Sequence, residues 1–365
     1  MKNILVIFGG QSVEHDVSII TGVLTLNSID KEIFNPIPVY ISKDLQWFTG
    51  KKLFDIDFYK NFSFEGLDKV SLIAGDNSLY VIKGKKIKKL HTIAVCVNCT
   101  HGELGEDGSL VGLLNMCKIP VASSTLLPSS VAMDKSITKI FLQGLKVNVL
   151  PSIEIFSAIE IEKVKNSLNY PLIVKPNRLG SSIGIEKIIS EKDIVLGVER
   201  ALKYGESVII EPLLNDFIEI NCACYKDKKG QLIVSECERP VGKDEVLSFD
   251  DKYQQGRREF PAKITKKQSD KIKELTKRVY EKLKFNGIIR IDYFLTKSNV
   301  YLNEINSVPG SLAYYLFCPS LKEFKNLLTE QIMVAEGRYI KELTAVKEFK
   351  SSILTGFGSK GAKHL

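Results

Sequence analysis

A continuous apolar stretch near the start of the chain constrains its fold more than any other feature. Residues 4–8 read Ile-Leu-Val-Ile-Phe and run directly into two glycines. A strand without polar positions must be buried on both faces, which is typical of parallel sheets covered by helices. Similar runs follow at 36–42, 92–98 and 119–123. Helices expected at 18–29 and 108–117 alternate with these strands, so the sequence predicts a three-layer α/β domain.

The middle of the chain predicts a second unit of α+β type. Residues 124–134 are small and polar and are expected to form a linker, with Asp134 capping a helix at 135–145. Strands are then expected at 147–155, 171–177, 184–188 and 207–213, with helices at 157–167 and 191–204. A stretch at 44–90 is expected to be irregular and to decorate the first unit.

From residue 217 onward the pattern becomes antiparallel. An amphipathic helix is predicted at 265–285, because Ile272, Leu275 and Val279 lie on one stripe. A hairpin follows, and then a helix near 320–340. The resulting domain boundaries are 1–125, 126–213 and 214–342, with a tail at 343–365.

The hairpin within 285–312 carries an unusual set of polar residues. Arg290 and Asp292 alternate with apolar residues in its first strand, as Glu304 and Asn306 do in its second. Side chains two apart share a face of a strand, so each pair lies on one face. A three-residue loop at 297–299 would set Asp292 opposite Glu304 and gather oxygen ligands suited to a hard cation. The alternative is a hairpin whose polar face meets only solvent.

Four further stretches combine glycines with charged residues at the ends of strands. They are 9–18 with Glu14, 101–108 with His101, 171–185 with Lys175, Ser181 and Ser182, and 207–219 with Glu211 and Glu219. The Gly/Ser loop after Lys175 can offer backbone N–H groups to phosphate oxygens, although a plain hairpin would read the same. The acids could equally be helix caps, helix N-turn charges or solvent-facing strand ends. Together the four stretches indicate a nucleotide-using enzyme with its site at domain junctions.

Composition excludes several other classes. The 51 basic and 43 acidic residues give a net charge of +8, but the basic residues are dispersed, which argues against nucleic acid as a partner. The sequence shows neither a signal peptide nor an apolar run long enough to span a membrane, so a cytoplasmic protein is expected. Seven cysteines, among them Cys96 and Cys99, are expected to be buried and reduced. The fingerprint G-x-G-x-x-G at 356–361 is too close to the C-terminus to open a dinucleotide-binding helix.

Six motifs now carry a family resemblance. They are GGQSVEHDVS, HGELGEDG, KPNRLGSSIGI, DDKYQ, RID and NEINSVPG, and they span residues 1 to about 340 in this order. In these the chain resembles the ATP-grasp carboxylate–amine ligases, and among them the D-alanine–D-alanine ligases. The resemblance implies an ATP-grasp fold preceded by a Rossmann-like parallel-sheet domain. It also implies that ATP phosphorylates one D-alanine and that the amine of a second attacks the acyl phosphate, for peptidoglycan precursor synthesis.

The resemblance implies a role for each matching residue. Catalytic roles fall to Glu14, Ser181, Tyr253, Arg290 and Gly310. ATP would be bound by Lys135, Lys175, Ser182, Glu211, Glu219 and Lys252. One or two Mg²⁺ or Mn²⁺ ions would be held by Asp292, Glu304 and Asn306, and the second substrate by His101 and Tyr315. A homodimer is implied by analogy.

One departure from the family pattern concerns the second substrate. The family continues after NEINSVPG with G-[MF]-T-x-x-S, whereas this chain has Tyr314 and Tyr315, the latter at the position of the serine. D-serine, D-lactate or another amine therefore remain alternatives to D-alanine as acceptor. A non-catalytic nucleotide-binding protein would be expected to have lost a metal ligand or phosphate lysine, and none is lost.

Overall fold

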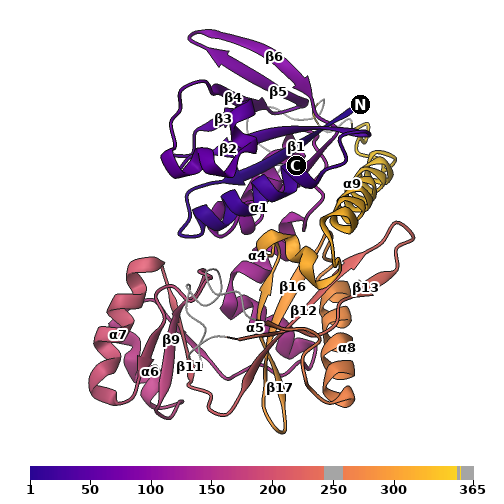
Figure 1. Cartoon of the computed structure of the whole chain (residues 1–365). Helices are drawn as coiled ribbons and strands as arrows, with labels where there is room; N and C mark the ends of the chain where they lie inside the picture. The colour runs from indigo at the N-terminus through magenta and orange to yellow at the C-terminus, as the bar shows by residue number, and fades with distance from the viewer. Residues whose placement is uncertain (242–257, 352–353, 355–365) are drawn as a thin grey trace.

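The first sheet confirms a parallel core around the N-terminal strand. A computed structural model of the chain describes residues 1–241, 258–351 and 354. β1 (Lys2–Gly9) pairs in parallel with β2 (Phe34–Ile41) and β7 (Val95–Asn98) (Figure 1). Alternate β1 residues pack on opposite faces: Phe8 lies in a core with α1 (His15–Ser28), and Ile7 in another with α3 (Ser109–Met116). The strand is therefore buried on both faces, as its sequence predicts.

The expectation that residues 44–90 are irregular is wrong. They form β3 (Trp47–Thr49), β4 (Asp68–Ile73), β5 (Asp76–Lys83) and β6 (Lys86–Thr92), with short 3₁₀ helices at Lys51–Phe54 and Ile56–Asn61. These strands extend the sheet antiparallel in the order β6-β5-β4-β3-β2-β1-β7. The outermost strand, β6, is exposed along most of its length, so its sequence lacks the alternation that predicts a half-buried strand. The strand predicted at 119–123 is reduced to one parallel bridge between Val121 and Cys96.

The second sheet is antiparallel and carries its helices on one face. Its order is β10 (Glu186–Ile188), β9 (Leu172–Pro176), β11 (Val208–Pro212) and β8 (Ile153–Ile155). α6 (Ile161–Lys165) and α7 (Ile194–Ala201) bury Val174 and Ile210 from that face. Because strand side chains alternate, Lys175 and Glu211 point to the other face.

The third sheet holds the predicted hairpin. Its order is β13 (Leu232–Val234), β12 (Ile218–Lys226), β16 (Ile289–Leu295) and β17 (Val300–Asn306). α8 (Lys266–Lys282) packs on one face through Ile272, Leu275 and Val279, so its predicted stripe is confirmed. Thr265 and Gln268 close its first turn with a capping box. A two-stranded ribbon, β14 (Arg239–Pro240) and β15 (Arg258–Glu259), adjoins this sheet.

The predicted linker at 124–134 is instead largely helical. α4 (Leu126–Met133) buries Pro128, Ser129 and Ala132, and its proline lies in the first turn, where it costs no helical hydrogen bond. Asp134 then caps α5 (Lys135–Gly144) by accepting a hydrogen bond from Ile137 N, as predicted. α5 contributes Leu142 to the same core as β12 and β16.

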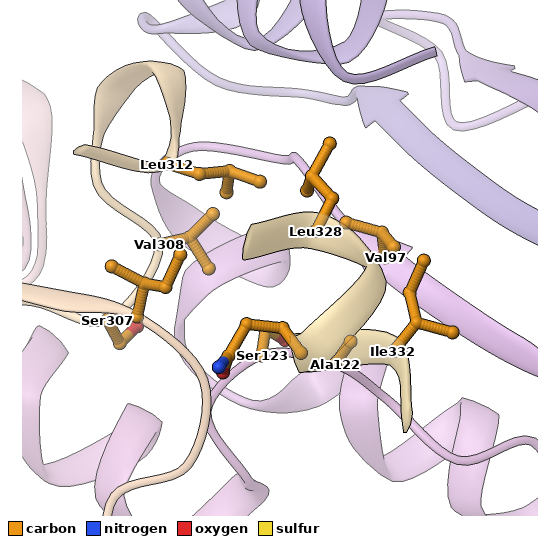
Figure 2. A pocket seen from close by; sticks show the side chains of 10 residues that line it. Val97, Ala122, Ser123, Ser307, Val308, Leu312, Leu328 and Ile332 are labelled. Carbon is orange, nitrogen blue, oxygen red and sulfur yellow. The ribbon is translucent and has the colours of Figure 1, made fainter. Parts of the chain in front are cut away.

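The C-terminal helix packs against the first sheet and against the residues that follow β17. α9 (Leu321–Leu343) shares a core with α1 and β1 through Phe324, Leu328 and Ile332. Figure 2 shows a small pocket where Val97 of β7 and Leu312 meet Leu328 and Ile332 of α9. In the described part of the chain, α9 included, no helix is long and apolar enough to cross a membrane. The fingerprint at 356–361 lies outside the described residues.

Candidate active site

The hairpin of β16 and β17 has the predicted pairing but reaches it by another route. Asp292 lies opposite Glu304, and Arg290 opposite Asn306. The loop, however, is 296–299, closed by Thr296 N donating to Asn299 O (2.9 Å), so the predicted three-residue loop is wrong. A β-bulge between Asp292 and Tyr293 shifts the register by one residue and restores the predicted partners. Bulges commonly redirect side chains beside active sites.

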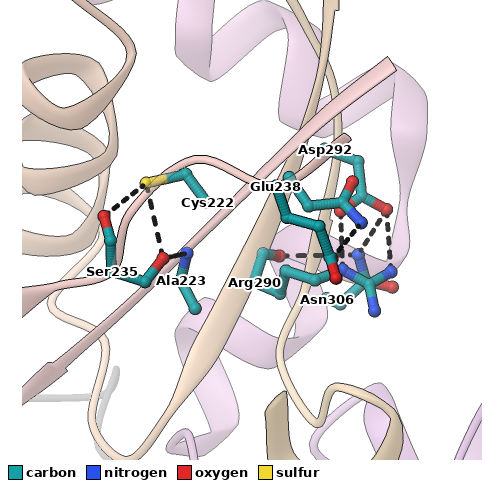
Figure 3. A network of polar contacts seen from close by, with 8 residues as sticks. Cys222, Ala223, Ser235, Glu238, Arg290, Asp292 and Asn306 are labelled. Carbon is teal, nitrogen blue, oxygen red and sulfur yellow. Dashed lines mark hydrogen bonds and ion pairs between the residues drawn. The ribbon is translucent and has the colours of Figure 1, made fainter. Parts of the chain in front are cut away.

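The polar face of this hairpin is held by charge-assisted hydrogen bonds. Arg290 donates two of them to Asp292, from Nε to Oδ1 at 2.7 Å and from Nη2 to Oδ2 at 2.9 Å. Asn306 Nδ2 donates to Asp292 Oδ2 at 3.1 Å (Figure 3). Two carboxylates, from Asp292 and Glu304, and one amide oxygen fit a hard divalent cation. Clusters of three or more His, Cys, Asp and Glu with metal-site geometry are absent from the described residues, since this set has only two acids.

Glu14 faces the Gly/Ser loop rather than its own helix. It occupies the N-cap position of α1, yet in the described structure its carboxylate does not cap that helix. Instead it accepts a hydrogen bond from Ser181 Oγ. A Cβ on Gly180 would lie 3.0 Å from Glu14 Oε2, and one on Gly102 would lie 3.1 Å from the same atom. Both glycines therefore leave the room that this carboxylate needs.

The Gly/Ser loop itself is held in an unfavourable backbone conformation. Ser181 and Ser182 have φ values of 55° and 59°, in the left-handed region that non-glycine residues rarely adopt. Such strain is typical of ligand loops, where surrounding structure enforces it. Lys135 Nζ donates to Leu179 O at 2.5 Å and so fixes the start of the loop. Burial lowers the pKa of Lys135.

A buried ion-pair cluster lies beneath this loop. Glu211 accepts from Lys139 Nζ at 2.5 Å and from Lys175 Nζ at 2.8 Å. Burial acts to raise the pKa of Glu211, but Lys175 and Lys139 outweigh it and lower the pKa to about 2. Lys175 also donates to Asn303 Oδ1 at 3.3 Å, which links the second sheet to β17. Glu211 is thus an anion that holds two lysines in place.

Two adjoining hollows join the parts of the site. One is lined by Glu14, Glu106, Lys135, Gly180, Glu304 and Asn306. The other is lined by residues that include Lys135, Lys175, Ser182, Glu219 and Glu304. Lys135 and Glu304 belong to both, so the two hollows meet above the hairpin.

Glu106 is a site residue that its motif alone did not identify. It accepts hydrogen bonds from Gly102 N and Val308 N, both at 3.0 Å, and so ties the first unit to the chain after β17. Burial, aided by the charge of Glu14, raises the pKa of Glu106 to about 7. Capping of α3 falls instead to Asp107, which accepts from Ser109 N at 2.8 Å.

A strained turn follows the hairpin and leads to Tyr315. Ser311, Leu312 and Ala313 have φ values of 51°, 51° and 47°, inside the 3₁₀ segment Gly310–Leu316. Ser311 N donates to Thr21 Oγ1 at 3.0 Å, and Thr21 lies 2.9 Å from His101 Nε2. Burial lowers the pKa of His101 to about 4, so this imidazole is neutral near pH 7.

Two arginines contact Tyr315. The side chain of Arg290 donates to its hydroxyl. The Arg258 guanidinium lies 5.0 Å from its ring centroid, within cation–π range, and Arg258 Nη1 donates to Glu238 Oε1 at 3.1 Å. Tyr315 therefore lies between the β16–β17 hairpin and the β14–β15 ribbon.

Two family models together match most of the chain. The model described as D-ala D-ala ligase N-terminus matches residues 3–124, and the one described as D-ala D-ala ligase C-terminus matches residues 150–334. The chain belongs to the D-alanine–D-alanine ligase family. Among curated relatives, the D-alanine–D-alanine ligase of Thermosipho melanesiensis is 36% identical, covering 93% of this chain and 95% of its own. D-alanine–D-alanine ligase A of Escherichia coli K12 is 31% identical over 92% and 95%.

Solved structures of the D-alanine–D-alanine ligase family share the fold. The enzyme from Helicobacter pylori superposes with a TM-score of 0.74 at 27% identity, covering 90% of this chain and 98% of that one. The VanG D-Ala:D-Ser ligase of Enterococcus faecalis has a TM-score of 0.77 at 25% identity, over 92% and 99%.

Most residues assigned from the family motifs line the two hollows or contact residues that line them. His101 lines a different hollow, with Gly9 and Gly10. Lys252 and Tyr253 lie in 242–257, outside the described residues. Three residues that line or support the site were missed: Glu106, Lys139 and Arg258. Lys139 could have been identified from the sequence, because it follows Lys135 by four residues on one helix and shares its face.

Proposed function

We propose that this protein joins two D-alanine molecules at the expense of ATP, for peptidoglycan precursor synthesis. The carboxylate of the first D-alanine takes the γ-phosphoryl group, and ADP leaves. The amine of the second attacks the resulting acyl phosphate and expels inorganic phosphate, with loss of a proton. The observation that carries the proposal is the convergence of Glu14, the Ser181 loop, Lys175 and the Asp292–Glu304 hairpin around two connected hollows.

The first D-alanine is placed by Glu14, whose carboxylate binds its ammonium group. Ser181, which belongs to the Gly/Ser loop, donates a hydrogen bond to that carboxylate and fixes it. Tyr253, which lies outside the described residues, is assigned to this end of the site by its family motif alone. The assignment of Glu14 is supported by its place on the wall of the hollow that it shares with Lys135 and Glu304.

ATP lies between the second and third sheets. Lys135, Lys175 and Lys252 bind its phosphates beneath the loop carrying Ser182, and Glu219 binds the ribose. Glu211 is assigned to the adenine, and its carboxylate also holds the phosphate-binding Lys175 through an ion pair. Asp292, Glu304 and Asn306 hold one or two Mg²⁺ or Mn²⁺ ions. When bound, these ions neutralise charge on the transferred phosphoryl group.

Arg290 and the Gly310 backbone N–H stabilise the oxyanion that forms when the amine attacks. Asp292 orients the Arg290 guanidinium through two hydrogen bonds, so the arginine is set before the substrate arrives. A donor fixed in advance lowers the barrier because it need not reorganise during reaction.

His101 and Tyr315 form the acceptor side. The phenol hydroxyl accepts a hydrogen bond from Arg290, which leaves its own proton free to donate to the acceptor carboxylate. D-Serine is the second candidate acceptor, supported by the likeness to a solved D-Ala:D-Ser ligase and by the departure at Tyr315. D-Lactate and other amines are the remaining alternatives.

The same proposal includes the protein's organisation. Units 1–125, 126–213 and 214–342 fold as domains around the site; of the predicted tail at 343–365, Leu343 ends α9, and 352–353 and 355–365 lie outside the described residues. The protein acts in the cytoplasm as a homodimer on small molecules, without nucleic acid or membrane as partner.

A substrate panel tests the acceptor directly. ADP release is measured with Mg-ATP and D-alanine alone, then with D-alanine plus D-serine, D-lactate or L-alanine, and products are identified by mass. D-Alanine alone is expected to sustain full turnover. Tyr315→Phe, which keeps the ring and removes the hydroxyl, should raise KM for the acceptor but leave KM for ATP unchanged. Release triggered only by a second, different acceptor would overturn the assignment.

A further inference from the structure

Two cysteines face each other across strands that adjoin the active site. Asn221 of β12 and Glu238 exchange both backbone hydrogen bonds, at 2.8 and 2.9 Å. One residue further along each strand, Cys222 lies opposite Cys237. A position next to such a hydrogen-bonded pair is a non-hydrogen-bonded pair, with Cα atoms about 4.5 Å apart. Disulfides span Cα separations of about 4.4–6.8 Å, so the backbone already places these residues for a bond.

The two thiols also contact each other. The Cys222 thiol lies within hydrogen-bond reach of the Cys237 sulfur and of Ser235 O, the latter at 3.8 Å; Figure 3 shows Cys222 with Ser235. The hydrogen bond from Cys222 lowers the pKa of Cys237 despite burial, with Ser269 and Lys273 assisting.

The other cysteine environments differ. Burial raises the pKa of Cys99 to about 12 and that of Cys224 to about 12. Cys224 lies two residues from Cys222 on the same strand, but opposite Val234. Since the thiolate is the reactive form, the lowered pKa assigns the attack within the facing pair to Cys237 and not to Cys222.

We propose that Cys222 and Cys237 are a redox modification site, which peroxide converts to a cross-strand disulfide. The Cys237 thiolate attacks one oxygen of hydrogen peroxide, which breaks the O–O bond, gives a sulfenic acid and releases hydroxide. The Cys222 sulfur then attacks the sulfenic sulfur, the S–S bond forms, and water leaves. Two thiols and one peroxide yield one disulfide and two waters, and a dithiol reductant reverses the change.

The bond would connect two segments that carry site residues. Cys237 precedes Glu238, which holds Arg258 against Tyr315, and Cys222 follows Asn221, which pairs with Asp292 across β12 and β16. Because the strands are already in register, the disulfide keeps these two segments in their present positions and does not distort them. The disulfide also lowers the conformational entropy of the unfolded chain, so the oxidised protein is expected to be the more stable form.

Peptide mapping tests the site without any measurement of ligase activity. The reduced, full-length protein is treated with hydrogen peroxide, denatured, and alkylated with N-ethylmaleimide. Five of the seven cysteines are expected to be alkylated, with Cys222 and Cys237 joined, and dithiothreitol should restore all seven. Cys222→Ser and Cys237→Ser should each prevent the bond, while the matched control Cys224→Ser should retain it.

A thermal melt of the oxidised protein provides the second readout. Its midpoint should lie above that of the reduced protein, and the difference should vanish in Cys222→Ala and in Cys237→Ser. Alkylation of all seven cysteines after a dose of peroxide that fully oxidises free dithiothreitol would overturn the proposal. Pairing of other cysteines, or a lower melting midpoint on oxidation, would also overturn it.

Discussion

Replacing Lys139 by Met tests how much the buried ion-pair cluster of Lys139, Lys175 and Glu211 stabilises the fold. Lys139, Lys175 and Glu211 have side chains that are 6%, 9% and 3% exposed, and the two lysines lie on separate oxygens of one carboxylate. The substitution keeps an unbranched chain of similar volume but removes one of the two cations. It also removes the hydrogen bond from Lys139 Nζ to Leu150 O at 2.8 Å.

The expected loss of stability follows from the carboxylate. The pKa of Glu211 falls from 4.5 to about 2 on folding. At about 1.4 kcal/mol per pKa unit, the fold stabilises its charged form by ~3 kcal/mol. Burial also lowers the pKa of Lys139, so the intact pair contributes less than this to the net balance. Lys139→Met leaves Glu211 paired with Lys175 alone and leaves Leu150 O without this donor, so we expect it to cost about 2 kcal/mol.

Urea unfolding followed by circular dichroism measures the free energy directly. Lys139→Met with Glu211→Gln should be less stable than Lys139→Met, because the buried Lys175 cation then loses the Glu211 carboxylate. Lys165→Met, at an exposed ion pair, is the control and should change little. The Glu211 pKa is depressed, so its contribution is present above pH 4.5 and is lost as pH falls toward 2; the Lys139→Met variant should lose less in that window. A loss below about 1 kcal/mol for Lys139→Met, or a double variant as stable as the single one, would refute the reasoning.

Three further substitutions test separate parts of the site. Glu304→Gln should lower turnover about a thousandfold while leaving the thermal midpoint unchanged, and unfolding in place of inactivation would contradict a metal-binding role. Glu106 has a folded pKa of about 7 against 4.5 unfolded, so the stability it contributes falls as pH rises between these values. Without divalent ions, the parent should therefore lose ~2 kcal/mol of stability between pH 4.5 and pH 8, after allowing for partial exposure, and Glu106→Gln should not show this loss; identical pH profiles of the two proteins in urea unfolding would contradict this. Ser311→Gly relieves a left-handed strain of about 1–2 kcal/mol but adds a glycine cost of about 0.5–1 kcal/mol, so unfolding should show a gain of about 0.5 kcal/mol, and a clear loss would contradict the strain.

The sequence predicted those features that rest on local periodicity. The two-faced burial of β1, the α8 stripe and the pairing of Asp292 with Glu304 all follow from which face a side chain occupies. The length of the hairpin loop could not be predicted in this way. A longer loop with a bulge pairs the same residues as a shorter loop without one. Polar edge strands such as β6 were missed because exposure removes the alternating pattern.

Contacts between segments that are distant in the chain could not be predicted from the sequence. Arg258 meets the ring of Tyr315 from a ribbon 57 residues away, and neither residue has a neighbour that signals the other. Glu106 reaches Val308 across an even longer separation. Lys139 is the exception, since helical spacing from Lys135 would have placed it in the same cluster.

Transfer of isotope from substrate to phosphate tests the central proposal most directly. D-Alanine labelled with ¹⁸O in its carboxylate is incubated with Mg-ATP, and the inorganic phosphate and amino-acid product are examined by mass. Attack of the amine on an acyl phosphate breaks the bond between carbon and the labelled oxygen. We therefore predict one ¹⁸O in each phosphate released and an equal amount of D-alanyl-D-alanine. Unlabelled phosphate, or hydrolysis of ATP that does not depend on D-alanine, would contradict the proposal.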